Sequence, residues 1–317
     1  MISVNQQATK IVEQMVAQAE ALGVGVSTLA RGTRVIDAGV QARGGLQAGK
    51  YLAEACLGGL GEVNFLPLDF DDFWLPGVSV AVSQPAVGCM ASQYAGWAIK
   101  REAFFAMGSG PARALSRVEE LFDKLDYKDE ADVAVIVLEG RTLPNDDVAS
   151  YIAGKCDVSP AALSILIAPT ACVAGSVQIS ARVVETGLHK MVELGFDIRQ
   201  VTSGYGTCPL APVAKDDLHA IGRTNDCVLY GGRVYYAVQA EDAEIESLIE
   251  RLPSSSSRDY GTPFYELFKE YGDFYQIDPL LFSPAQALIN NVASGKSYQA
   301  GQINTTILKT SLIEGKT

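Results

Sequence analysis

Histidine is almost absent from this chain, which has only His189 and His219 among its 317 residues. A metal site built from several histidines is therefore excluded, and a Ser-His-Asp or Cys-His catalytic arrangement would have to use one of these two. The six cysteines are scattered and form no Cys-x-x-Cys pair. This usage is typical of reduced thiols in a cytoplasmic protein, and we expect no metal site.

Basic residues are also in short supply, with 25 Lys and Arg against 37 Asp and Glu, so that the net charge is −12. This balance disfavours nucleic acid or an anionic membrane surface as the main partner, although a local basic pocket would still suit a small anionic ligand. The two long charge-free stretches, 73–99 and 158–181, are interrupted by proline, glycine, serine and glutamine. We therefore expect buried strands and turns there rather than membrane spans, and the amphipathic start, 1–23, lacks the pattern of a signal peptide.

Apolar residues are plentiful, at 48% of the chain. A chain of this length exceeds the usual size of one core, so we expect two lobes that share a cleft. We place the lobes at 1–168 and 169–317, with the possibility that they are interleaved. Expected helices include 5–22, 46–57, 111–124, 263–277 and 285–292, and expected strands include 24–30, 33–38, 78–82, 132–138, 163–167, 227–230 and 234–238. Residues 202–209 and 253–258 are expected to be loops, the latter flexible.

An internal duplication is suggested by two similar segments. Strands 78–82 and 163–167 are each followed by a proline, Pro85 or Pro169, and seven residues after it by a serine, Ser92 or Ser176. If the repeat is real, each serine lies near the N-terminus of a helix, where backbone N–H groups favour an anion. A helix N-cap is the alternative role for either serine.

The stretch 174–191 carries the strongest functional signal. As a helix it would bury two apolar ridges, and between them Gln178, Arg182, Glu185 and His189 would form one narrow polar stripe. Charges on a mostly buried helix are costly unless they are paired or line a wet cleft. On the residues alone, Arg182 and Glu185 form either a site or an ordinary ion pair three residues apart. We interpret His189 as structural.

Six blocks of sequence carry a family resemblance. They are Ser92-Gln93-Tyr94-Ala95-Gly96-Trp97, Ser109-Gly110-Pro111-Ala112-Arg113-Ala114, Pro169-Thr170, Ala174 to Met191, Gly222-Arg223-Thr224-Asn225-Asp226 and Pro263-Phe264-Tyr265-Glu266. With these blocks the chain resembles the methenyltetrahydromethanopterin cyclohydrolases over nearly its whole length. The resemblance implies an enzyme that adds water to the methenyl bridge of a tetrahydropterin one-carbon carrier and gives the N5-formyl form, in methanogenesis or bacterial formaldehyde oxidation. It also implies a mixed α/β (α+β) fold of two lobes around a central pocket. The resemblance further implies a cytoplasmic homotrimer without a metal or prosthetic group, the pterin carrier being the substrate.

The chemistry assigns roles to the stripe. We expect Glu185 to hold and deprotonate a water, and Arg182 to orient Glu185 and bind the developing oxygen. Substrate-binding candidates are Gln178, Ser92, Ser176 and Arg223. The alternatives are cyclohydrolase action on a folate-type carrier, a non-catalytic phosphate- or nucleotide-binding oligomer that uses Ser92 and Ser176, and a structural assembly protein.

Overall fold

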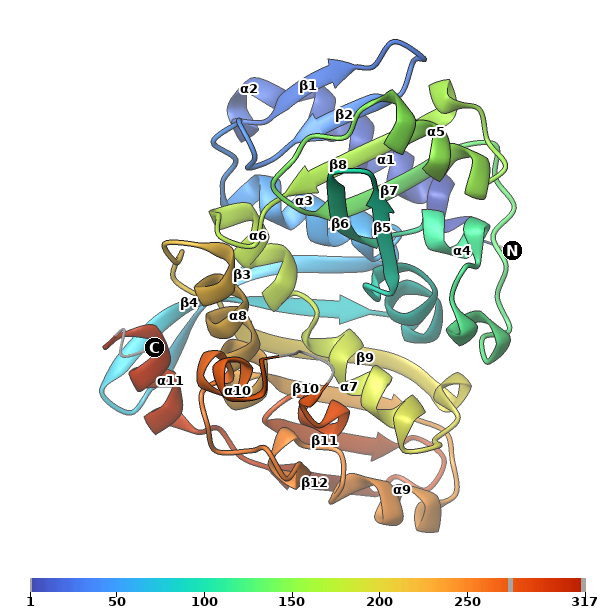
Figure 1. Cartoon of the computed structure of the whole chain (residues 1–317). Coiled ribbons are helices and arrows are strands. Elements are labelled where there is room, and N and C mark those ends of the chain that lie inside the picture. The colour runs from blue at the N-terminus through green and yellow to red at the C-terminus, as the bar shows by residue number, and fades with distance from the viewer. Residues whose placement is uncertain (1, 273–275, 315–317) are drawn as a thin grey trace. The chain divides into compact units, whose positions relative to one another are not determined.

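Two mixed sheets organise the computed structural model, which describes residues 2–272 and 276–314 (Figure 1). The chain divides into two compact units, each discontinuous in sequence. Unit 1 contains the residues through Glu62 together with Val87–Gln178, and unit 2 contains Val63–Ala86 and the residues from Ile179 onward. The mixed α/β class is confirmed. The unit boundaries differ from a division at residue 168, because 63–86 belong to unit 2 and 169–178 to unit 1.

Unit 1 is built on a six-stranded sheet in which three central strands run parallel. The strand order is β1 (Gly25–Thr28), β2 (Arg34–Asp37), β8 (Leu163–Ala168), β7 (Ala134–Glu139), β6 (Phe104–Ser109) and β5 (Trp97–Arg101). β2, β8 and β7 are parallel, and β1, β6 and β5 pair antiparallel to their neighbours. The helices are α1 (Val4–Ala17), α2 (Ala19–Leu22), α3 (Leu46–Cys56), α4 (Ala112–Ser116), α5 (Asp146–Lys155) and α6 (Val173–Ser180), the last of which ends two residues into unit 2.

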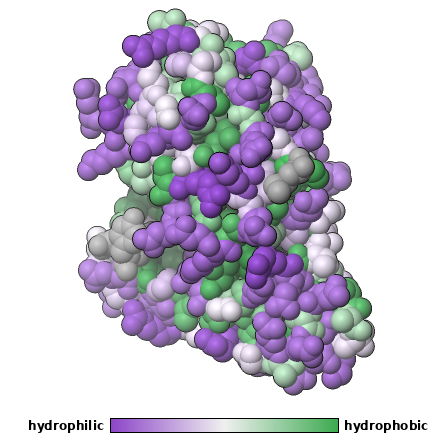
Figure 2. All heavy atoms as spheres, turned by 90° about the vertical axis from the view of Figure 1, so that its right-hand side faces the viewer, coloured by the Kyte–Doolittle hydropathy of each residue, from purple (hydrophilic) through white to green (hydrophobic). Residues whose placement is uncertain are grey.

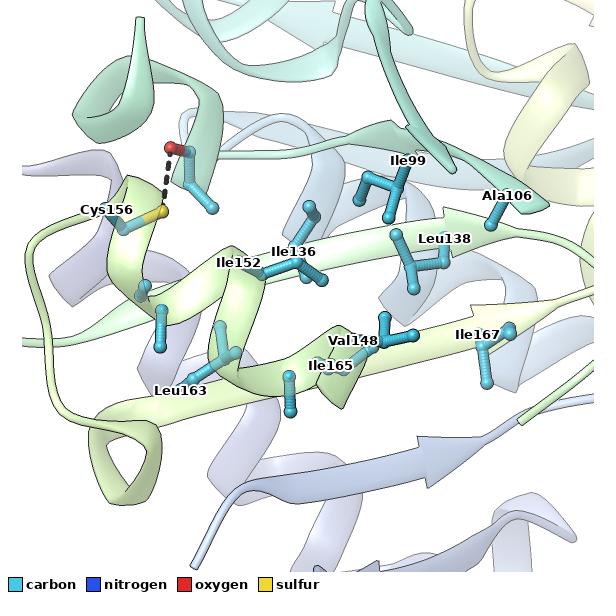
Figure 3. Close-up of a cluster of buried hydrophobic side chains, with 14 of the residues drawn as sticks. Ile99, Ala106, Ile136, Leu138, Val148, Ile152, Cys156, Leu163, Ile165 and Ile167 are labelled. Carbon is cyan, nitrogen blue, oxygen red and sulfur yellow. Dashed lines mark hydrogen bonds between the residues drawn. The ribbon is translucent and has the colours of Figure 1, made fainter. Parts of the chain in front are cut away.

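Both faces of this parallel core are covered. Ile136 and Leu138 of β7 join Ile152 of α5 in one cluster, which is drawn in Figure 3. Val135 and Val137, which alternate with them along the strand, belong to a second cluster with residues of α1 and α3. Burial on both faces explains why the sequence here is a continuous apolar run rather than an alternating one.

Unit 2 is built on a second six-stranded sheet. Its order is β12 (Ser297–Gly301), β11 (Gln286–Asn291), β10 (Arg233–Val238), β9 (Val201–Pro209), β4 (Phe73–Val82) and β3 (Gly61–Phe70). β10 and β11 are parallel, whereas the pairs β11–β12, β9–β10 and β4–β9 are antiparallel. The helices are α7 (Val183–Glu193), α8 (Asp217–Gly231), α9 (Asp242–Ile249), α10 (Phe264–Tyr271) and α11 (Thr305–Leu312).

Short helices complete the described chain. A π-helix covers Ala86–Gln93, and 3-10 helices cover Glu120–Asp123, Pro160–Ala162, Ile198–Gln200, Ser254–Ser256 and Pro279–Leu281. Within the described residues, no helix combines the length and the apolar character that crossing a membrane requires. Hydrophilic residues cover most of the face drawn in Figure 2, with smaller apolar areas between them.

Several sequence-based expectations are wrong. The helix expected over 285–292 is strand β11, which pairs with a strand on each side. Its side chains alternate between buried and half-buried, because they point in turn to the two faces of the sheet. The strand expected over 227–230 is the last part of α8, although its valine, leucine and tyrosine favour strands. The expected loop 253–258 is packed, since Ser254 is fully buried and its hydroxyl bonds the carbonyl of Leu229. The part of the expected helix 263–277 at 273–275 lies outside the described residues.

The helix expected to run from Pro111 to Lys124 ends at Ser116, where Arg117 adopts a left-handed backbone with φ 46°. Its Arg113 is fully buried, although arginine is usually exposed. The guanidinium donates to Glu119 through Nε at 2.7 Å and, through Nη1, to the carbonyls of Met90 and Ser92. Arg113 therefore anchors the π-helix, which its position in the sequence could not indicate.

Glycines let α7 approach its sheet closely. The expected glycine loop 202–209 is the central strand β9, and a Cβ on Gly204 would lie 2.6 Å from Val184 Cγ1 of α7. A Cβ on Gly187 of α7 would lie 2.2 Å from the hydroxyl of Tyr236 in β10. That hydroxyl is fully buried and donates to the carbonyl of Val184 at 2.7 Å. The glycines thus fix how α7 sits on β9 and β10.

We predict that Gly187→Ala destabilises the protein by about 1–3 kcal/mol, because the added methyl displaces the Tyr236 hydroxyl in a packed core. The matched control is Gly154→Ala in α5, where a Cβ meets nothing within 4 Å. This second substitution should be neutral or stabilising by about 0.5 kcal/mol, since alanine favours helix more than glycine does. Urea unfolding of both variants measures the difference, and equal stabilities would contradict the packing account.

Candidate active site

A pocket of about 150 Å³ lies within unit 2 and brings together most of the polar stripe. Its lining residues are Ile179, Arg182, Glu185, Thr186, His189, Asn225, Val228, Leu229 and Phe282. They come from the end of α6, the first two turns of α7, the second half of α8 and the segment after the helix Pro279–Leu281. Apolar side chains form one part of the wall, and polar side chains of α7 and α8 form the rest.

The expected continuous helix 174–191 is broken. α6 ends at Ser180 and α7 begins at Val183, with Arg182 as its N-cap residue. Glu185 therefore lies in the first turn of α7. The N-terminus of a helix stabilises a carboxylate, because the exposed N–H groups carry partial positive charge. The break thus gives Glu185 a favourable electrostatic position that a helix interior would not provide.

Arg182 and Glu185 form an ion pair of low exposure. Arg182 Nη1 lies 3.9 Å from Glu185 Oε2, and the two side chains are only 12% and 7% exposed. The distance is that of an ion pair and is too long for a hydrogen bond between these atoms. Since little solvent screens the two charges, removing either one would leave the other charged group buried at a cost. The ordinary surface ion pair, the alternative for these residues, does not fit this burial.

Three further polar residues share the pocket. His189 follows Glu185 by one turn of α7, and its Nε2 lies 3.9 Å from Glu193 Oε1. The hydroxyl of Thr186 donates to the carbonyl of Arg182 at 2.7 Å, and the amide of Asn225 donates to the carbonyl of Ile221 at 2.9 Å. The sequence stripe contained His189, which we interpreted as structural. Asn225 lies in one of the blocks that carry the family resemblance, but no role is assigned to it there. Phe282 has no sequence feature that indicates a site, because only the tertiary fold brings these elements together.

The remaining candidates lie outside this pocket. Ser176 and Gln178 are buried in α6 and belong to unit 1. Arg223 is in α8, where Nη1 lies 3.5 Å from the carbonyl of Pro212 and Nε is buried without a hydrogen-bond partner among the described residues.

The helix start expected at Ser92 is wrong. This residue is near the end of the π-helix Ala86–Gln93 and precedes strand β5, so it does not start a helix. It is fully buried, and its hydroxyl donates to the carbonyl of Cys56 at 2.6 Å. Ser176, in contrast, is the fourth residue of α6. The two segments of the suggested duplication therefore differ in local structure, and Ser92 offers no N-terminal anion site.

The donor set of the pocket suits activation of water on an electrophilic substrate. In the parts of the chain that the structure describes, no three His, Cys, Asp or Glu side chains gather where they could hold a metal ion. The pocket offers a carboxylate that can accept a proton and a guanidinium that can stabilise a developing oxyanion. Among the residues that the structure describes, neither serine nor cysteine lines this pocket, so these side chains supply no nucleophile there.

Comparisons with known proteins give one consistent result. A family model described as Cyclohydrolase (MCH) matches residues 3–312. The methenyltetrahydromethanopterin cyclohydrolase of Methanococcoides burtonii is 45% identical over 311 residues, which cover 97% of each chain. The relative of the same name from Methanothermobacter marburgensis is 46% identical over 97% of this chain and 98% of its own. That from Methylobacillus flagellatus is 46% identical over 96% and 94%.

A buried lysine on α7 holds the later part of the helix. Lys190 is 1% exposed, and its Nζ donates to the carbonyl of Pro253 at 2.7 Å and to the hydroxyl of Ser256 at 2.8 Å. Burial lowers the pKa of Lys190 to about 7, with Asp278 opposing and Arg251 adding to the shift. The lysine thus ties α7 to the 253–258 segment.

We predict that the free energy of unfolding rises with pH between about pH 7 and the ordinary lysine pKa of 10.5. In this window the unfolded chain binds a proton at Lys190 that the folded chain does not, so this residue contributes up to about 1.4 kcal/mol per pH unit. The free energy of unfolding, measured with urea at pH 7, 8 and 9, should rise less steeply with pH in Lys190→Met than in the wild type. The exposed substitution Lys155→Met should keep the wild-type dependence on pH. Identical slopes in all three proteins would contradict the assignment.

Proposed function

Because this chain belongs to the methenyltetrahydromethanopterin cyclohydrolase family, we propose that it hydrolyses 5,10-methenyltetrahydromethanopterin to the N5-formyl form. The chain spans nearly the full length of the relatives that bear this name. The observation that carries the proposal is the Arg182–Glu185 pair of low exposure in a pocket of unit 2. Both residues lie in the sequence block that resembles the family most specifically.

The substrate itself supplies the electrophile. Its methenyl carbon lies between two nitrogens of a delocalised cation, so it needs a positioned water and a base rather than a metal or a prosthetic group. Glu185 holds the water and takes its proton as the oxygen attacks the carbon. Arg182 orients Glu185 and stabilises the charge that develops on the oxygen. When the adduct collapses, the bond from carbon to N10 breaks, N10 takes a proton, and the carbon remains on N5 as a formyl group.

The pocket walls suit a flat aromatic substrate. Phe282, Val228 and Leu229 offer apolar surface for a ring, and the amide of Asn225 offers polar contacts at its rim. For the anionic tail of the carrier we retain Arg223, whose buried Nε has no hydrogen-bond partner among the described residues, which supports a ligand role. Gln178 and Ser176 are retained as substrate contacts on the family resemblance. Ser92 is not, because its hydroxyl is buried against Cys56.

The names of the relatives favour methanopterin over a folate-type carrier. A non-catalytic anion-binding oligomer loses its main support, since Ser92 does not start a helix.

We predict that Glu185→Gln lowers kcat by about 10²–10⁴-fold, the usual contribution of a general base. The assay follows the decay of the methenyl chromophore on addition of the protein. The matched control is Glu250→Gln, an exposed position in unit 2, which should keep the wild-type rate. A near-wild-type rate for Glu185→Gln would contradict the assignment, and faster turnover of methenyltetrahydrofolate by the wild type would favour the folate alternative.

A homotrimer in the cytoplasm is the assembly and location that the family resemblance supports, and it forms part of the same proposal. Light scattering of the purified protein is expected to give three times the mass of one chain. A monomer or dimer that retains full activity would contradict this part of the proposal and leave the assignment of the reaction intact.

A further inference from the structure

One face of α7 carries three titratable side chains of increasing exposure. Glu185, His189 and Glu193 follow each other at intervals of four residues, which places them on consecutive turns of one helix face. Their side chains are 7%, 22% and 42% exposed, respectively. Glu185 and His189 line the pocket, and His189 Nε2 lies 3.9 Å from Glu193 Oε1, which is ion-pair distance when the ring is protonated. The series therefore leads from the pocket to solvent.

The reaction needs such a route. A cationic methenyl substrate and water give a neutral formyl product and one proton. Water loses one proton when its oxygen attacks the carbon, and the adduct hydroxyl loses a second when the carbonyl forms. N10 takes up one proton as its bond to carbon breaks, so one proton per turnover remains on Glu185. Glu185 has to return this proton to solvent before it can act as a base again.

We propose that His189 relays this proton from Glu185 to Glu193 and thence to solvent; this inference rests on the proposed function. Neutral imidazole accepts the proton on one ring nitrogen, directly or through a water, and the imidazolium formed is stabilised by the nearby carboxylate of Glu193. Deprotonation of the ring towards Glu193 and solvent restores the neutral form. His189 touches no reacting atom in this scheme and acts only through Glu185.

The test is kcat of His189→Gln in dilute buffer, followed by titration with imidazole. Glutamine retains hydrogen bonding but does not titrate, so kcat should fall by about tenfold to a hundredfold. Added imidazole should restore the rate in proportion to its concentration, after subtraction of the enzyme-free rate. Glu193→Gln, at an exposed position, should lose less activity and should also respond to imidazole. A purely structural role for His189 would produce a loss that imidazole does not relieve.

The other histidine provides the matched control. His219 stacks on Tyr265 with ring centroids 4.3 Å apart and contacts Asp216, and it does not line the pocket. His219→Gln should keep the wild-type kcat and show no imidazole effect. A wild-type kcat in His189→Gln, or a loss insensitive to imidazole, would overturn the relay and leave the proposed function standing. Absence of ring opening by the wild type would instead overturn the proposed function.

Discussion

The site depends on the close approach of α7 to strands β9 and β10. Gly187 and Gly204 have no Cβ where a methyl group would collide with Tyr236 and Val184, and the Tyr236 hydroxyl bonds the carbonyl of Val184. This contact lies immediately before Glu185, so the first turn of the helix is fixed relative to the sheet. Lys190 fixes the same helix one turn later through Pro253 and Ser256. A buried carboxylate can be positioned accurately only because the backbone around it is held on both sides.

The reaction makes modest demands that such a rigid pair can meet. The substrate arrives as a cation that is already electrophilic, so polarising metal ions or covalent intermediates are unnecessary for the proposed chemistry. A carboxylate and a guanidinium in a poorly solvated pocket stabilise developing charges more strongly than they would in water. Glu185 lies in the first turn of α7, where the helix N-terminus carries partial positive charge, and the proposed proton route follows the increase in exposure along the same helix. Base, orienting cation and proposed relay thus belong to one element.

Helical spacing in the sequence predicted the part of the site that comes from one continuous segment. Helical spacing placed Arg182, Glu185 and His189 on one face, and the break before Val183 did not disturb this because all three lie at or after it. Tertiary features escaped prediction. The glycines of β9 favour a loop when only the sequence is considered. They are needed because α7 packs closely against this strand, and the sequence of the strand alone does not indicate that contact. In the sequence Arg113 looks exposed, because the carbonyls of Met90 and Ser92 that accept its hydrogen bonds come from another segment. Phe282 joins the pocket through a contact with no counterpart in the sequence pattern.

The central claim is that ring opening takes place in the pocket lined by Arg182, Glu185 and Phe282. The most direct test is a crystal structure of the protein with the Glu185→Gln substitution, soaked with 5,10-methenyltetrahydromethanopterin. The account predicts the methenyl carbon in this pocket, with a water held between it and residue 185 and the guanidinium of Arg182 beside that water. A pterin ring bound elsewhere, with this pocket left empty, would contradict the account.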